Sequence, residues 1–303
     1  MNHRRGLRRG NTLSRMAVLL PLCLLALAVN VPAAAARKKP TAEPRSYIET
    51  SYLVAPRQIE DFQLEAASYT SEQKYSGAGF RYALKGHQEI RLDIYVYPAG
   101  RMTQAEALDA GMKAFRDDLQ LAVERGSYSQ LQELEQTSFA LTPPATASQT
   151  PENDFDAEVL KAIAQAVQVT GRKLQLAMTL QPNNWRLFSN GYLFHKQLYY
   201  VKLRASAAQE RISREEFNAL TDHAARTLIP AIAVANIGEC ANTTLYLPSG
   251  ASAEESALAL VRQSALHKGH NCYLSAKDAK VDARRETAEI IEISYSAQEW
   301  KSQ

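Results

Sequence analysis

Alternating apolar and polar positions around a turn predict a β-hairpin early in the chain. Phe80, Tyr82 and Leu84 alternate with small or polar residues, and apolar residues return at every second position of 90–96 after a turn that contains glycine. This spacing on both sides of a turn is typical of a hairpin with one buried face. The opposite face of the second strand carries Arg91, Asp93, Tyr95 and Tyr97.

Three segments begin with the signature of a capping box, a Ser or Thr followed three residues later by Glu, and continue with apolar residues at helical spacing. In a capping box the hydroxyl and the carboxylate each accept a backbone N–H that the helix leaves unbonded. The pattern predicts helices over 103–124, 213–228 and 252–269. The alanine-rich segment 153–170 predicts a further helix, inserted on the surface.

The remaining alternating segments predict short strands. Strands, a helix, more strands and a second helix indicate an α+β fold, an antiparallel sheet with helices packed on it as in an α/β/α sandwich. After position 236 the order strand, helix, strand, strand predicts a small β-α-β-β unit tied by a disulfide. The other strands are expected at 62–66, 131–141, 174–180, 185–189, 192–194, 199–203, 240–247, 272–274 and 291–295.

These elements predict a chain of successive parts. We expect a signal peptide at 1–36, a flexible lead-in at 37–49, a main α+β domain at 50–235 with its helical insertion at about 153–170, and a small C-terminal α/β domain at 236–303.

A hairpin, a long helix, a meander of strands and a closing helix follow one another at Gly79–Tyr97, Thr103–Glu124, Leu174–Leu203 and Ser213–Leu228. This order, over 62–232, resembles the α/β/α sandwich of the PsbP/DcrB-like proteins, which include a photosystem extrinsic subunit and a bacterial periplasmic protein. The resemblance has no residue-specific motif, so it implies a fold and no site residue. Members of that group are mostly binding or accessory proteins, which implies a non-catalytic protein by analogy.

The start of the chain has the three parts of an export signal. A basic leader contains five arginines and no acidic residue. An apolar run at 16–31 follows, shorter than the about 20 residues that span a bilayer, and Ala33–Ala36 offers small residues for cleavage. We therefore expect a periplasmic protein. Secretion from the cell, or anchoring by an uncleaved signal, are the alternatives.

Cleavage of this leader changes the charge of the protein. The whole chain has a net charge of +3, whereas without the leader 35 − 5 = 30 basic side chains face 32 acidic ones, a net of −2. The remaining 303 − 36 = 267 residues are enough for a sizeable core. A slightly acidic chain has no general attraction for nucleic acid, so we expect no nucleic-acid partner. We also expect no stable membrane insertion after cleavage.

Two cysteines remain after cleavage, Cys240 and Cys272. An even count in an oxidising compartment predicts a disulfide. Closing a loop of about 31 residues would stabilise the fold by roughly 3–4 kcal/mol through loop-closure entropy. The alternative is a pair of buried thiols.

The common catalytic motifs do not occur in the sequence. It has no Gly-x-Ser-x-Gly elbow, no His-Glu-x-x-His pair and no phosphate-binding Gly-Lys-Ser/Thr loop. We expect that the protein binds no cofactor, and we favour a non-catalytic protein over an enzyme. One alternative is an enzyme whose site is assembled from His87, Asp93 and His195. Another is metal binding through His267 and His270 beside a reduced cysteine.

Aromatic and cationic side chains gather on one face of the predicted strands. Such a face, if no helix covers it, is suited to an envelope protein, a peptide or a glycan. The alternative is that a helix or the C-terminal unit packs over it. The candidate binding residues are Arg91, Tyr95, Tyr97, Tyr200, Lys202 and Arg204.

Overall fold

The structure of the chain is a computed structural model. The predicted signal peptide at 1–36 and most of the predicted lead-in lie outside the described residues. The residues that the structure describes belong to one compact unit. The described residues are 45–141, 153–167 and 169–300.

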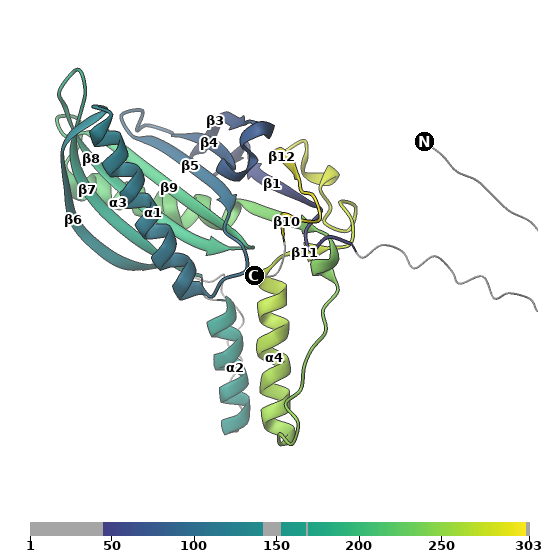
Figure 1. The fold of residues 1–303 in the computed structure, drawn as a ribbon. Coiled ribbons are helices and arrows are strands. Elements are labelled where there is room, and N and C mark those ends of the chain that lie inside the picture. Colours follow the sequence, from purple (N-terminus) through teal and green to yellow (C-terminus); the bar gives the residue numbers. More distant parts are fainter. Residues whose placement is uncertain (1–44, 142–152, 168, 301–303) are drawn as a thin grey trace, which may run out of the picture. The chain divides into compact units, whose positions relative to one another are not determined.

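An eight-stranded antiparallel sheet is the largest element of this unit (Figure 1). Its strands alternate as predicted, because Leu92, Ile94 and Val96 are buried on one face while Tyr95 and Tyr97 lie on the other. In spatial order the strands are β2 (Gln58–Ile59), β3 (Phe62–Tyr69), β4 (Ala78–Leu84), β5 (Arg91–Pro98), β9 (Tyr199–Ala208), β8 (Trp185–Lys196), β7 (Thr170–Leu180) and β6 (Tyr128–Ala140).

Helices cover both faces of this sheet. Helix α1 (Gln104–Glu124) lies across one face, where Met112 and Phe115 pack with Leu174 (Figure 1). We call this the α1 face. The opposite face forms a larger core with α3 (Arg214–Ala231) and with the second sheet. The sheet is therefore the middle layer, and the predicted α+β class is confirmed.

A four-stranded sheet packs on the face opposite α1. Its central strand β1 comes from the start of the described chain, where no strand was expected, and pairs antiparallel with β10 on one side and β12 on the other. The expected boundary near position 235 therefore does not separate two bodies, because the C-terminal strands need β1 between them. In spatial order the strands are β11 (Cys272–Tyr273), β10 (Ala233–Ile237), β1 (Thr50–Pro56) and β12 (Ala288–Ser294).

Two further helices, α2 (Asp154–Val167) and α4 (Ala253–Gly269), pack against each other. The capping boxes predicted at Thr103 and Ser252 are both formed, and Ser213 caps α3 by accepting the N–H of the third helical residue. Across the described ranges, no helix is both long and apolar enough to cross a bilayer. Short 3₁₀ turns lie at Ser71–Ser76, Glu239–Ala241 and Asp282–Arg284.

The strand predicted at 240–247 is wrong. Cys240 lies in a 3₁₀ turn, and the following residues form no strand. The backbone of Tyr246 is instead bonded by the Gln263 side chain of α4, whose Oε1 accepts its N–H at 2.9 Å and whose Nε2 donates to its carbonyl at 2.7 Å. The Gln263 side chain thus makes the two backbone hydrogen bonds that a neighbouring strand would otherwise make with Tyr246.

Two short strands predicted at 185–189 and 192–194 are one continuous strand, β8. Gly191 lies inside this strand. Because it has no side chain, the ring of Phe115 from α1 can pack directly over its backbone. The predicted disulfide between Cys240 and Cys272 is confirmed, and it ties the turn after β10 to β11.

Candidate functional site

The six candidate binding residues lie together on the α1 face. Strands β5 and β9 are neighbours, with Tyr95 opposite Lys202 and Tyr97 opposite Tyr200. Residues directly opposite each other in an antiparallel pair point to the same face. The prediction that these side chains share one surface is therefore met by the register.

Helix α1 covers half of this set. Tyr200 is 7% exposed and its hydroxyl donates to the Ala107 carbonyl at 2.8 Å. Lys202 is 9% exposed, with its ammonium 3.3 Å from the Asp118 carboxylate and 5.1 Å from the Phe115 ring centroid. The half-buried Tyr97 packs against the same cluster. Three of the six candidates are thus packing residues under α1, because an apolar helix face needs an apolar surface below it.

The other three candidates, Arg91, Tyr95 and Arg204, line an open cleft of about 380 Å³ on the same face. Tyr128 and Trp185 join them from β6 and β8. We call these five residues the cationic–aromatic cleft.

The aromatic wall of the cleft comes from a row of residues level with one another across three strands. Tyr128 lies opposite Leu180, and Leu180 lies opposite Trp185. Trp185 is 55% exposed, an unusual position for so large an apolar ring. Sequence reasoning missed both aromatics, although Trp185 follows a polar turn and begins the alternation that places Leu187 and Ser189 on this face.

The charges of the cleft are nearly balanced. The Asp93 carboxylate bonds the Arg81 guanidinium at 2.9 Å and also accepts from Arg91, and this second bond raises the pKa of Arg91. Among the described residues no ion pair involves Arg204, which lies 5.9 Å from the Phe115 ring. Burial raises the pKa of Tyr95, so its hydroxyl stays protonated. One guanidinium and several ring faces are therefore open to a ligand.

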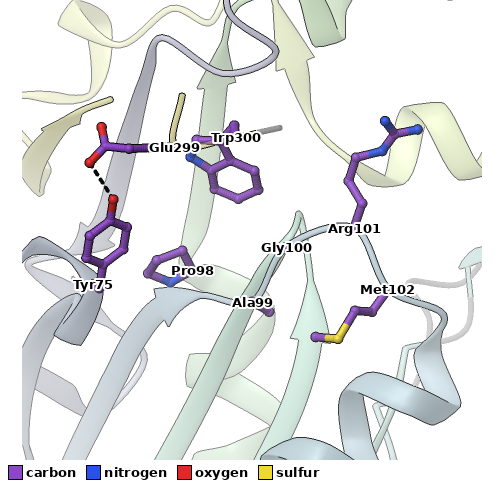
Figure 2. Close-up of a pocket in the computed structure, with 8 residues that line it drawn as sticks. All are labelled: Tyr75, Pro98, Ala99, Gly100, Arg101, Met102, Glu299 and Trp300. Atoms are coloured by element: carbon purple, nitrogen blue, oxygen red, sulfur yellow. Dashed lines mark hydrogen bonds between the residues drawn. The ribbon is translucent and has the colours of Figure 1, made fainter. Parts of the chain in front are cut away.

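A smaller pocket of about 210 Å³ lies at the other end of β5 (Figure 2). Its polar groups bond one another, since the Glu299 carboxylate accepts from Tyr75 and lies 2.8 Å from Lys74. These hydrogen bonds lower the pKa of Glu299 to about 2. Arg101 turns away from the pocket, over the ring of Tyr47. The carboxylate of this pocket is therefore already paired within the protein.

The structure does not bring the candidate catalytic residues together. His87 lies at the β4–β5 turn and bonds Glu89 at 3.1 Å, while Asp93 is held by two arginines. His195 of β8 lies opposite Tyr200 of β9, which in turn lies opposite Tyr97 of β5. Asp93 lies earlier in β5 than Tyr97, and β5 is two strands away from His195. A proton relay through these three side chains is not formed.

The alternative of a metal site loses its thiolate ligands, because both cysteines are in the disulfide. His270 bonds the Tyr47 hydroxyl through Nδ1 at 3.2 Å, and His267 contacts Thr243. Within the described part of the chain, no three His, Cys, Asp or Glu side chains are placed to hold one metal ion. The chain matches no protein-family model, and no curated protein matches it.

Proposed function

We propose that this protein is an exported, non-catalytic binding module of the cell envelope and that the cationic–aromatic cleft binds a glycan. The observation that carries the proposal is the exposed ring of Trp185 beside Tyr95, Tyr128 and the guanidinium of Arg204. A flat aromatic face packs on the C–H face of a sugar ring, while guanidinium and carboxylate groups bond its hydroxyls.

The position of the cleft favours a glycan over an extended peptide. Its floor lies on β5, β9 and β8, which have neighbours on both sides, and only Tyr128 comes from the edge strand β6. A peptide that adds a strand needs an unpaired sheet edge, which this floor does not offer. The near balance of charge around Asp93 also favours an uncharged ligand over a strongly charged one.

Export is supported by the basic and apolar leader and by the disulfide between Cys240 and Cys272. Disulfides persist in oxidising compartments and are rare where glutathione keeps thiols reduced. The envelope is therefore the place where this cleft would meet its ligand.

Binding is tested by titrating the purified protein with soluble oligosaccharides of envelope glycans, following heat release and tryptophan fluorescence. Trp185 is exposed and Trp300 is 8% exposed, so the ligand-dependent change in emission should come from Trp185. We expect Trp185→Ala to weaken binding about 10- to 100-fold, the equivalent of removing one well-buried aromatic contact.

Tyr75→Ala is the matched control, because Tyr75 is 56% exposed and lies at the other pocket. It should bind as the wild type does. Binding of extended peptides instead of oligosaccharides, or equal affinity of the Trp185→Ala and wild-type proteins, would contradict the proposal.

A further inference from the structure

A third pocket, of about 310 Å³, lies between the start of α1, the turn from β8 to β9 and the end of α4. Its wall is largely apolar and includes Leu198 and the exposed Leu266. Its polar side chains include His195, Lys196 and His270, and no Asp or Glu lines it. The pocket therefore combines a hydrocarbon surface with basic groups.

His195 carries the strongest sign of a ligand. Its Nε2 is buried and has no hydrogen-bond partner among the described residues. Burial lowers the pKa of His195, so the imidazole is neutral, and a smaller opposing effect comes from its bond to the backbone of Gly100. With Nδ1–H as the donor of that bond, Nε2 is the acceptor. Buried polar atoms are nearly always bonded, so an unbonded Nε2 at a pocket needs a partner from outside the chain.

The surroundings of this nitrogen are neutral or positive. The Lys196 ammonium lies on the opposite face of the sheet from the His195 ring, where it donates to the Ile229 carbonyl at 2.8 Å and to the Ile232 carbonyl at 2.7 Å at the end of α3. Burial lowers the pKa of Lys196 to about 8, so it is mostly charged at neutral pH. Burial and the nearby His267 and Arg101 lower the pKa of His270 to about 4, so this ring is neutral. Because no Asp or Glu lines the pocket, it holds no group that would pair with a positive ligand.

We propose that this pocket binds a small amphiphilic carboxylic acid, with its carboxyl group at Nε2 of His195 and its hydrocarbon chain against Leu198 and Leu266. The carboxyl group satisfies Nε2 with either placement of the proton, since the neutral acid donates to the imidazole and the carboxylate accepts from the imidazolium. An alcohol gains nothing from the charge of the imidazolium, and no Asp or Glu lines the pocket to pair with an amine.

The test is calorimetric titration of the purified protein with sodium octanoate, octan-1-ol and octylamine. Octanoate should bind most tightly. His195→Asn keeps a donor for the Gly100 carbonyl and removes Nε2, so octanoate binding should weaken roughly tenfold or more, the loss expected for a charge-assisted hydrogen bond. His87→Asn, at a turn far along the sheet, is the matched control and should bind as the wild type does.

A second readout separates the hydrogen bond from a structural effect. In proton NMR titrations octanoate should raise the pKa of His195, because the bound carboxylate favours the imidazolium. Should His195→Asn fail to fold, the comparison moves to Leu266, which is 65% exposed and tolerates change. Leu266→Glu should weaken octanoate binding and Leu266→Lys should strengthen it.

Three results would overturn the proposal. They are equal octanoate affinity of the wild-type protein and of a His195→Asn protein that folds, equal octanoate affinity of the Leu266→Glu and Leu266→Lys proteins, and binding of Zn²⁺ alone without any binding of octanoate.

Discussion

The contact between α1 and the sheet can be tested at Gly191, which lies under the ring of Phe115. A Cβ added at Gly191 would lie 2.1 Å from Cε1 and 2.5 Å from Cζ of Phe115, below the 3.0 Å that real Cβ atoms keep. Phe115 is 2% exposed and packs with Met112 and Leu119. The ring cannot move alone, so Gly191→Ala must displace part of α1.

Overpacking of a filled core costs about 1–3 kcal/mol, and two short contacts place Gly191→Ala near about 2 kcal/mol. Urea unfolding followed by circular dichroism measures this loss. Gly269→Ala is the control, since its Cβ would meet nothing within 4 Å, and its stability should stay within about 1 kcal/mol of the wild type. In a Phe115→Leu background the same Gly191→Ala change should cost about 1 kcal/mol less, because the smaller side chain makes room.

Wild-type stability of the Gly191→Ala protein would refute this reasoning. Helix α1 would then not rest on β8, and Tyr97, Tyr200 and Lys202 would return as candidates for ligand contact. Strict additivity of the two substitutions would refute the direct contact between Phe115 and position 191.

Three more predictions concern the stability of the fold. Cys240→Ser, which breaks the bond to Cys272, should lower the free energy of unfolding by about 3–4 kcal/mol, measured in urea against the oxidised wild type. Lys173→Met should cost about 2–3 kcal/mol in the same assay, because the buried ammonium lies 2.6 Å from the partly exposed Asp222 carboxylate. His270 has a pKa lowered to about 4 from 6.5 by burial, so below pH 6.5 the unfolded chain gains a proton that the folded chain does not. Stability should therefore fall as the pH drops towards 4, and His270→Gln should weaken that dependence in melts across this range.

Features set by neighbours in the sequence could be predicted well. The capping boxes at Thr103 and Ser252 need only residues three positions apart, and both helices begin where expected. Alternation along β5, β7 and β9 identified buried faces for the same reason, since the two faces of a strand differ at every second residue. The resemblance to the PsbP/DcrB-like proteins rests on this local order and stays a prediction.

Features set by distant pairing could not be predicted. Strand β1 has no strong pattern of its own, and its place between β10 and β12 depends on residues more than 170 positions away, such as Leu53 opposite Val234. The β strand expected at 240–247 failed for the converse reason, because a suitable local composition found no neighbouring strand. The missed Trp185 shows the same limit, since alternation gives its face but not whether a helix covers it.

The cleft follows from the relative widths of the two elements on the α1 face. Eight strands about 4.8 Å apart make a sheet about 34 Å wide between its outer strands, whereas one helix with its side chains is about 10–12 Å across. The opposite face is buried by α3 together with the second sheet, but the apolar core on the α1 face is centred on α1. Helix α1 therefore shields Tyr200 and Lys202 and cannot also shield Arg204, Tyr95 and Trp185. Whether a residue of this alternating surface packs under α1 or lines the open cleft depends on its distance from the axis of α1, and this is why the six candidates divided into three of each kind.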